Sequence, residues 1–411
     1  MKQIKLLKVL FYFLPILIFL IILTPNTAHG GDQTCWIEWA KFQYQFGISK
    51  TYRGWTDYLP LYHYVLNVYG KMCGSIDEIQ LNIKCLKYIT YIFELGSTII
   101  LFYVLNNKFK DYYKSLFYSL FYFLNIAVLY NSAVWGQVDG NMTFFVFSSI
   151  IAAYYNKNYL AFVLFVLGLN MKLQTIFFLP LLMYVVALNF EKKSLLNLVI
   201  GLVLAVLTQL LIIAPFYMNG DLHKLWHVIV NSNGKYPAIT MNAYNIWAIL
   251  VDPKDFFKSD NEVFLGFSYH IWGLIYFFFS AFVVLIIPFI RSLKALFKKE
   301  KMIVSLNEIL LIGALIPLIF FFFNTQMHER YSHPALIFIT TYSLLNNKKI
   351  VLIISTFAYF QNLEGVSHLL SFNNCHTLIF TPWFIATLYL ITIILLLFEL
   401  FKLQKELLKP N

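Results

Sequence analysis

Apolar runs long enough to cross a lipid bilayer recur along almost the whole of this sequence. A membrane-spanning helix needs about 20 mostly apolar residues. Sixty per cent of the 411 residues are hydrophobic and 12% are charged, against about 25% charged in an ordinary soluble domain. The pattern predicts an all-α polytopic membrane protein and excludes a soluble globular protein, a disordered chain and a disulfide-rich secreted scaffold. Candidate spans lie near 8–24, 88–106, 115–133, 142–155, 159–171, 174–190, 195–217, 267–290, 305–323, 333–346, 350–370 and 377–401.

The basic residues predict which side of the membrane each segment occupies. Lys2, Lys5 and Lys8 precede the first span, so the N-terminus is placed in the cytoplasm. With about twelve spans, both termini are cytoplasmic and most of the 31 Lys and Arg residues fall in inside segments. The net charge of +11 then reflects the positive-inside rule rather than nucleic-acid binding. We expect one membrane domain over 1–411, with long outer loops at about 25–87 and 218–266.

Two features of the outer side leave alternatives open. Thr27-Ala-His-Gly30 follows the first span, which could therefore be a cleaved signal peptide; the remaining topology would be unchanged. The four cysteines, Cys35, Cys73, Cys85 and Cys375, all fall on the outer side. A Cys73–Cys85 disulfide and free thiols are both compatible with this placement.

The first outer loop is dense in aromatic residues, which prefer the headgroup level of a membrane. Residues 33–46 are predicted to form a helix along the interface. Asp32 precedes it, either as an N-cap or as a general base at the water–lipid boundary. Asp57 precedes another amphipathic run, where capping is the favoured interpretation. Tyr58 follows it in the same segment.

Polar side chains also gather in the short outer segments. Trp135-Gly-Gln-Val-Asp139 includes Gln137 and Asp139, side chains suited to hydrogen-bonding a hydroxyl-rich ligand such as a sugar. Tight turns and interface anchoring explain Trp135 and Gly136 better than they explain these two. Lys172 lies between two short spans, where it either snorkels or meets a lipid phosphate.

Two later segments continue this pattern. Asn242-Ala-Tyr-Asn-Ile-Trp247 places Asn242, Asn245 and Trp247 at the end of the second long loop. These residues suit a sugar or headgroup contact, and equally an ordinary re-entry into the interface. His328, Glu329 and Arg330 follow the apolar run 320–323. Three consecutive ionisable residues at the membrane boundary are costly unless they pair or bind something, which favours a functional role.

These segments together resemble the GT-C glycosyltransferases, which use lipid-phosphate sugars. The first outer loop resembles that of the ER glucosyltransferases that use dolichyl-phosphate glucose, where an Asp precedes a Trp by seven positions, as Asp32 precedes Trp39 here. That family then has Asp-Tyr-Pro-Pro, Phe-Lys-Gln and His-Glu-Lys segments. The matching stretches here are Asp57-Tyr-Leu-Pro60, Met171-Lys-Leu-Gln174 and His328-Glu-Arg330, with Leu59, Met171, Leu173 and Arg330 as departures.

The Trp135–Asp139 and Asn242–Trp247 stretches are more similar to prokaryotic integral-membrane mannosyltransferase-like proteins, related to those of GPI-anchor synthesis. The resemblance implies a GT-C fold and an inverting transfer of mannose or glucose from a polyprenyl- or dolichyl-phosphate sugar to a hydroxyl acceptor, such as a lipid-linked glycan. It implies no cofactor and no metal, in keeping with the lack of a DxD motif. A bacterial inner membrane is favoured over an ER membrane.

The same resemblance implies roles for individual residues. Asp32 is the expected general base, with Asp57 as the fallback, and the donor phosphate is expected to meet Lys172, His328 and Arg330. The sugar or acceptor is expected to contact Tyr58, Gln137, Asp139, Asn242, Asn245, Trp247 and Glu329. The alternative class is a polytopic transporter or lipid flippase. A site near the membrane midplane, reached by Glu94 and Lys172, would favour it.

Overall fold

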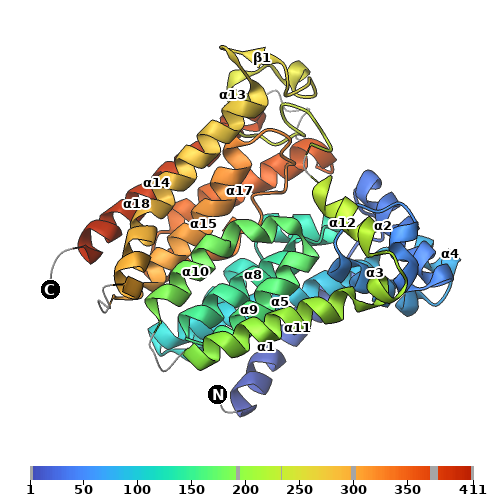
Figure 1. The fold of residues 1–411 in the computed structure, drawn as a ribbon, viewed down its shortest axis with the longest axis horizontal. Coiled ribbons are helices and arrows are strands. Elements are labelled where there is room, and N and C mark those ends of the chain that lie inside the picture. Colours follow the sequence, from blue (N-terminus) through green and yellow to red (C-terminus); the bar gives the residue numbers. More distant parts are fainter. Residues whose placement is uncertain (1–2, 191–194, 233, 298–301, 371–377, 409–411) are drawn as a thin grey trace. The chain divides into compact units, whose positions relative to one another are not determined.

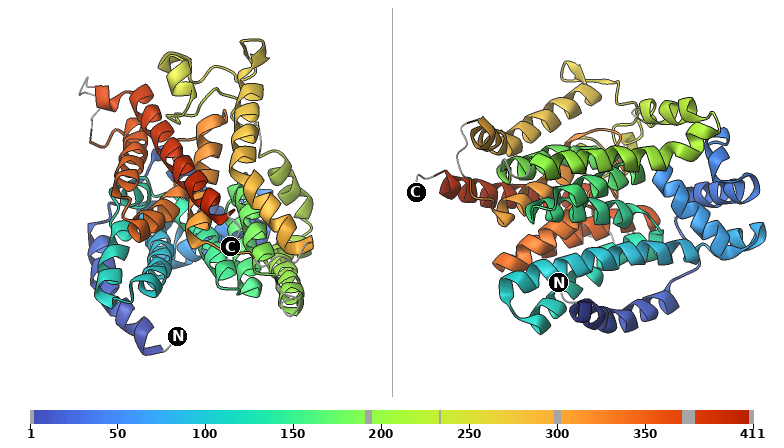
Figure 2. Two further views of the ribbon diagram at one scale, coloured as in Figure 1. Left: turned by 90° about the vertical axis from the view of Figure 1, so that its left-hand side faces the viewer. Right: turned by 60° about the horizontal axis from the view of Figure 1, so that its bottom comes forward.

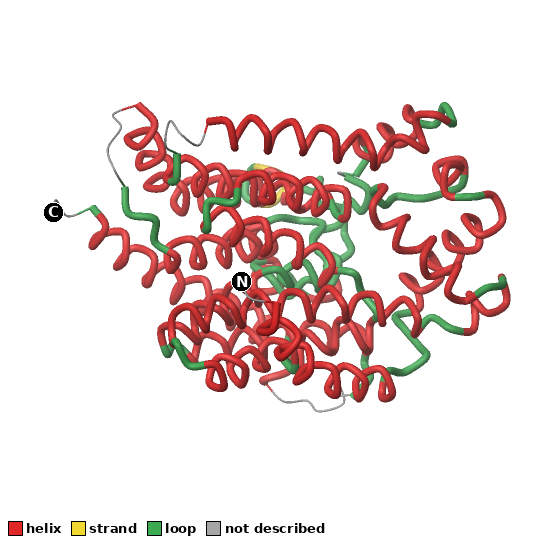
Figure 3. The backbone as a smooth tube through the Cα atoms, turned by 90° about the horizontal axis from the view of Figure 1, so that it is seen from below, coloured by secondary structure: helices red, strands yellow, loops and turns green. Residues whose placement is uncertain are grey.

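Long helices make up most of the protein, as a computed structural model shows (Figure 1). It describes residues 3–190, 195–232, 234–297, 302–370 and 378–408. Helices account for 78% of it, and the strands form only a two-stranded hairpin within this described part (Figure 3). The chain divides into two compact units, each built from several segments. Unit 1 comprises 1–148, 163–175 and 203–233, and unit 2 comprises 149–162, 176–202 and 234–411. Lys2 and Cys375 lie outside the described residues.

Six helices in the described part are long and apolar enough to span a membrane, or seven if a bent pair counts as one span. The six are α5 (Lys84–Phe109), α11 (Leu195–Met218), α14 (Tyr269–Phe297), α15 (Leu306–Phe323), α17 (Lys349–Ser367) and α18 (Pro382–Leu407). The bent pair joins Tyr112–Phe123 to Ile126–Trp135 at 46°. The polytopic membrane architecture expected from the sequence is therefore supported.

Unit 1 is organised around α5. The helices α1 (Gln3–Leu23), α3 (Pro60–Cys73) and α6 (Tyr112–Phe123) pack against it, and α2 (Gly30–Phe46) packs on α3. Val9, Phe13 and Phe102 belong to the apolar core between α1, α5 and α6. The remaining elements of unit 1 are η1 (Ile48–Arg53), α4 (Ile76–Leu81), α7 (Ile126–Leu129), η2 (Tyr130–Trp135) and α12 (Leu222–Val230).

Four elements contribute residues to both units, because the division falls within them. They are α8 (Asp139–Tyr154), α9 (Asn158–Met171), η3 (Leu173–Phe178) and α11. Few residues of α11 are buried (17% of its most apolar window), although its mean hydropathy there is 2.6. An apolar helix that turns most of its surface outward is typical of a lipid-facing span.

Unit 2 is organised around α15, where 78% of the residues in the most apolar window are buried. This helix contacts α14, α16 (Ala335–Asn346) and α18 (Figure 2). Proline is accommodated inside α14 and α15, as membrane helices allow. The hairpin of β1 (Val263–Phe264) and β2 (Phe267–Ser268) directly precedes α14. The remaining elements of unit 2 are α10 (Leu179–Leu188), α13 (Trp247–Leu250), η5 (Pro253–Asp255), α17 and η7 (Leu378–Phe380).

Helix starts follow local side-chain chemistry. Ser75 caps α4 by accepting from the Glu78 amide, and Ser305 caps α15 by accepting from the Glu308 amide, in the pattern of a Ser followed three residues later by Glu. Pro60 begins α3, where a missing amide hydrogen costs nothing. Cys73 and Cys85 are free thiols, so the structure contains no Cys73–Cys85 disulfide.

Candidate functional site

Asp32 lies in the first turn of α2. The N-cap of this helix is His29, and its side chain makes no capping bond. Of the two alternatives for Asp32, the N-cap is therefore wrong: Asp32 is the third helical residue, after Gly30 and Gly31. The positive end of the helix dipole still favours a carboxylate there.

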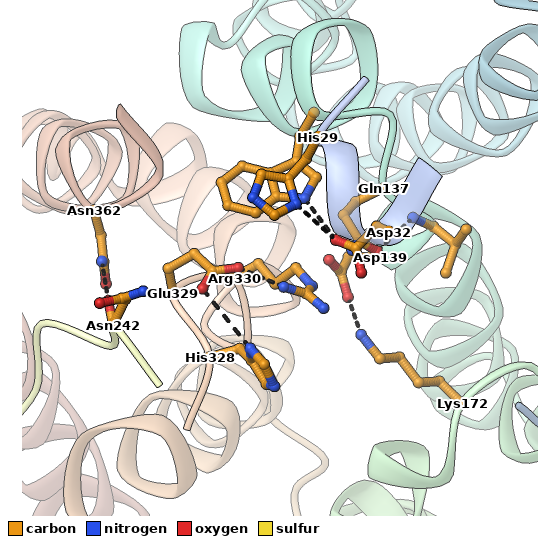
Figure 4. A network of polar contacts seen from close by, with 12 residues as sticks. His29, Asp32, Gln137, Asp139, Lys172, Asn242, His328, Glu329, Arg330 and Asn362 are labelled. Atoms are coloured by element: carbon orange, nitrogen blue, oxygen red, sulfur yellow. Dashed lines mark hydrogen bonds and ion pairs between the residues drawn. The ribbon is translucent and has the colours of Figure 1, made fainter. Parts of the chain in front are cut away.

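Two side-chain donors hold the Asp32 carboxylate (Figure 4). The indole N–H of Trp135 donates to Oδ2 at 2.8 Å, and the amide of Gln137 donates to the same oxygen at 2.6 Å. The His29 Nδ1 lies 3.6 Å from this oxygen. The Asp32 side chain is 23% exposed, so the carboxylate is oriented by the protein and still reaches solvent.

The segment before α2 is fixed against the C-terminal part of η2. The His29 ring stacks on Trp135 with a centroid distance of 4.3 Å, and the His29 amide donates to the Trp135 carbonyl at 3.1 Å. The Lys87 ammonium donates to the carbonyls of Pro25, Thr27 and Ala133. One buried lysine thus ties together two segments that are far apart in the sequence.

Gly136 allows this close approach. Its φ of +80° is left-handed, and an added Cβ would lie 3.1 Å from Ala28 Cβ and 3.2 Å from Lys87 Cε. A larger residue would therefore be both strained and crowded at this position. Tight-turn geometry explains Gly136, as the sequence indicates, and that turn also aims Trp135 and Gln137 at Asp32.

A buried ion pair lies at the start of α8. The Lys172 ammonium donates to Asp139 Oδ1 at 2.5 Å, and the two side chains are 9% and 2% exposed. Asp139 begins α8 two residues after Gln137, while Lys172 follows the end of α9. The structure therefore brings together Asp32, Gln137, Asp139 and Lys172 within unit 1, through a chain of contacts in which Gln137 and Asp139 share one short segment.

Glu94 is the single acidic residue of α5. It is fully buried. A Cβ added to Gly140 would lie 3.0 Å from Glu94 Oε1, so the acid packs directly against the first turn of α8. An ionisable residue inside a membrane span is by default a candidate for function.

Asp57 and Tyr58 lie in the turn before α3. The N-cap of α3 is Leu59, so the expected capping of this helix by Asp57 is wrong. The Tyr58 ring lies 5.4 Å from Trp39 and 4.9 Å from Tyr62, measured between centroids. Burial lowers the pKa of nearby His63 to about 3, so its neutral ring bridges Gln43 and Thr56 and steadies this turn.

In unit 2, His328, Glu329 and Arg330 form a charged turn between α15 and α16 (Figure 4). Glu329 is 2% exposed; Arg330 Nη1 donates to its Oε1, and His328 Nδ1 lies 3.8 Å from its Oε2. Burial favours the neutral acid, but the charges of Arg330 and His328 outweigh it and lower the pKa of Glu329 to about 2. Glu329 and Arg330 therefore form an ionised pair within this turn.

The segment around Asn242 pairs with this turn through its backbone. Met241 and Asn242 form isolated bridges with His328, and the Met241 amide donates to the Met327 carbonyl at 2.9 Å. Asn362 donates to the Asn242 carbonyl at 2.8 Å and accepts from the Tyr244 amide at 3.0 Å. Asn242 and the 328–330 turn thus belong to one hydrogen-bonded structure within unit 2.

Asn245 and Trp247 are fully buried and bond to the end of α15. The side-chain amide of Asn245 donates to the carbonyls of Phe321 and Asn324 at 3.1 and 3.2 Å. The indole N–H of Trp247 donates to the Asn324 carbonyl at 3.2 Å. These bonds satisfy carbonyls that a helix end otherwise leaves unpaired. A contact of these two residues with a sugar stays a prediction.

Several supporting residues escape sequence reasoning. His29, Lys87, Asn362 and Asp260 lie outside the set of residues that the sequence predicts. The Oδ2 of Asp260 accepts from Thr325 and Gln326 at 2.7 and 2.9 Å. The one available signal was Lys87, a lysine at the edge of an apolar run. Among the described residues, no group of three or more His, Cys, Asp or Glu is placed to hold a metal ion.

Neither a protein-family model nor a curated protein matches this sequence. Its function therefore has to be inferred from the residues and contacts described above.

Proposed function

We propose that the protein is an inverting GT-C-type glycosyltransferase that crosses the membrane about twelve times. It would move mannose or glucose from a polyprenyl- or dolichyl-phosphate sugar to a hydroxyl acceptor on the outer face. The observation that carries this proposal is the Asp32 carboxylate, oriented by Trp135 and Gln137 and partly open to solvent. The shorter apolar helices, among them Leu7–Leu23 and Asn158–Met171, would supply further spans.

In the proposed reaction, Asp32 accepts the proton of the acceptor hydroxyl as that oxygen attacks the anomeric carbon of the donor. The new glycosidic bond forms as the bond from the anomeric carbon to the phosphate oxygen breaks. The lipid phosphate leaves with the bonding electrons, and the configuration at the anomeric carbon inverts. A positioned base of this kind contributes about 10²–10⁴-fold to rate. Asp57 is the fallback base.

The leaving phosphate requires cations, and the proposal assigns Lys172, His328 and Arg330 to this role. Lys172 is paired with Asp139 and Arg330 with Glu329. A phosphate would therefore have to compete with Asp139 for Lys172 and with Glu329 for Arg330. This competition favours a fully charged phosphate group over a neutral ligand. The sugar or acceptor contacts are assigned to Tyr58, Gln137, Asp139, Asn242, Asn245, Trp247 and Glu329.

The experiment offers polyprenyl-phosphate mannose and polyprenyl-phosphate glucose separately to purified protein in lipid nanodiscs, with an extract of candidate acceptors. Mass spectrometry follows free lipid phosphate and new glycosides. Turnover of one donor would support the proposal and identify the sugar. If neither donor turned over and neither bound, the proposal would be contradicted.

A transporter or lipid flippase is the second candidate, and buried Glu94 in α5 is the observation that favours it. Transporters place ionisable residues along a substrate path inside the membrane. Flipping of a fluorescent lipid or a polyprenyl-phosphate sugar in protein-containing liposomes tests this reading. Flipping that is lost in Glu94→Gln, without any glycoside product, would favour the transporter over the transferase.

A further inference from the structure

A pocket separate from the residues around Asp32 opens in unit 1, between α2, η1 and α4. Its volume is about 340 Å³. Trp39, Phe42 and Trp55 supply aromatic walls, while Glu38, Lys41 and Gln45 supply polar groups. None of the contacts described above for Asp32 involves these polar groups.

The pocket combines an aromatic wall with a hydrogen-bonding rim. The rings of Trp39 and Trp55 are 5.4 Å apart at 46°, and Trp55 is 62% exposed. Trp39 is 5% exposed, and its Nε1 has no hydrogen-bond partner among the described residues. At the rim, the Lys41 ammonium contacts Glu38 at 3.2 Å and Gln80 at 2.6 Å.

This combination matches the chemistry of a pyranose ring. One face of a sugar ring presents polarised C–H bonds, which pack on the electron-rich face of an indole. The ring edge carries hydroxyl groups, which pair with carboxylate, ammonium and amide groups. An acyl chain would use the aromatic wall but would leave Glu38 and Lys41 desolvated, at a cost. The rim therefore favours a sugar over a lipid tail.

The pocket and Asp32 share one helix, α2. Asp32 and Trp39 are seven residues apart, so both lie on the same side of the helix, about 10 Å apart along its axis. Tyr58 continues the aromatic surface, with its ring 5.4 Å from Trp39 and 4.9 Å from Tyr62. A short oligosaccharide is long enough to span the distance of about 10 Å between the pocket and Asp32.

We propose that this pocket holds a pyranose ring of the glycan acceptor, set back from the hydroxyl that is presented to Asp32. The inference rests on the proposed transferase function for the role of the sugar. The pocket's affinity for a sugar can nevertheless be measured without any donor.

The first test is saturation-transfer difference NMR with methyl α-mannoside, methyl α-glucoside and short oligomers of each sugar. The protein is held in phosphatidylcholine nanodiscs, because detergents with a maltose head would themselves offer a sugar. Transfer to ring protons of one sugar series is expected for the wild type and for Trp226→Ala, which removes an indole that is 65% exposed and does not line the pocket.

The pocket variants are Trp55→Ala and Trp55→Phe. Trp55→Ala is expected to weaken sugar binding about tenfold or more, while Trp55→Phe keeps an aromatic face and most of the affinity. If Trp55→Phe folds and still binds the sugar, the fold tolerates a change at position 55. Weaker binding by Trp55→Ala then reflects the lost aromatic face and not a misfolded protein. No transfer to any sugar in the wild type, or equal transfer in Trp55→Ala and Trp226→Ala, would overturn the proposal.

A second readout separates this inference from the transferase proposal. If one donor turns over, Trp55→Ala is expected to raise the acceptor KM while leaving kcat nearly unchanged, the signature of lost ground-state binding. An unchanged acceptor KM would overturn the pocket and leave the transferase standing. Sugar binding that depends on Trp55, without turnover of any donor, would support the pocket and contradict the transferase.

Discussion

The side-chain amide of Gln137 donates a 2.6 Å hydrogen bond to the carboxylate of Asp32, 105 positions earlier in the chain. The Trp135 indole donates to the same oxygen from two residues before Gln137. Two donors from one short segment therefore orient one acid at the start of another helix. A carboxylate held in this way is ready to accept a proton without first reorganising its surroundings.

Removing either donor should slow transfer without preventing folding. Trp135→Phe keeps an aromatic ring at the position that stacks on His29 but loses the indole N–H. Gln137→Ala loses the side-chain amide. We expect kcat to fall about tenfold to hundredfold in each. Donor and acceptor KM should stay nearly constant in Trp135→Phe, whereas Gln137→Ala should also raise the KM of the sugar that Gln137 contacts. Trp272→Phe is the control, because it removes an indole N–H that donates to the Phe264 carbonyl elsewhere. A fall in kcat as large for Trp272→Phe would argue against an orienting role.

Gly136→Ala should destabilise the protein more than Gly74→Ala. Both glycines have a left-handed φ, near +80° and +81°, so each alanine pays about 1–2 kcal/mol for that conformation. Gly74 faces open space, whereas a Cβ at Gly136 meets Ala28 and Lys87. Thermal unfolding in detergent should therefore show a lower Tm for Gly136→Ala. Equal Tm values would mean that Ala28 and Lys87 move aside for the added Cβ without lowering the stability of the protein.

The Asp139–Lys172 pair should show strong coupling in a double-mutant cycle. Lys172→Met leaves a buried carboxylate without its ammonium, which costs about 3–5 kcal/mol. Adding Asp139→Asn removes the stranded charge, so the double variant should be more stable than Lys172→Met alone. The more exposed Glu38–Lys41 pair provides the comparison, where the two changes should be nearly additive. Additive effects at Asp139 and Lys172 would contradict a buried ion pair.

Glu329 should stabilise the protein in a pH-dependent way. Its pKa in the folded protein is about 2, below the ordinary value of 4.5, because Arg330 and His328 outweigh the effect of burial. The unfolded state therefore takes up a proton first as pH falls. The contribution is complete above about pH 4.5 and is lost as pH falls toward 2.

The measurement compares the Tm of the wild type and Glu329→Gln from pH 7 down to pH 3. We expect the difference to be constant between pH 7 and about 5 and to shrink below pH 4.5. A Tm difference that grows on acidification would mean that folding raises the pKa of Glu329 instead of lowering it. That result would contradict the ionised Glu329–Arg330 pair.

The long membrane helices could be predicted from the sequence because their signal is local. The spans expected near 88–106 and 305–323 correspond to α5 (Lys84–Phe109) and α15 (Leu306–Phe323). The interfacial helix expected at 33–46 corresponds to α2 (Gly30–Phe46). Two starts were placed too early. The span from 267 includes β2, and the span from 333 includes the turn that ends at Pro334.

The contacts of the candidate site could not be predicted in the same way. Asp32, Gln137 and Lys172 each stood out as polar residues near a membrane boundary, but nothing local indicates that Trp135 bonds to Asp32 across 103 positions. Asp32 and Asp57 looked like helix caps because each precedes an amphipathic run. The residues at the N-cap positions, His29 and Leu59, make no side-chain capping bond. N-cap propensity therefore does not predict where these two helices begin.

The most direct test of the account compares Asp32→Asn with Asp77→Asn in donor turnover. Both acids lie in the first turn of a helix, Asp32 in α2 and Asp77 in α4, and Asp77 is exposed. With the donor that the wild type uses, Asp32→Asn should lower transfer about 10²–10⁴-fold, with unfolding temperature and donor binding retained. Asp77→Asn should remain near wild-type activity. Transfer that survives in Asp32→Asn would contradict Asp32 as the base.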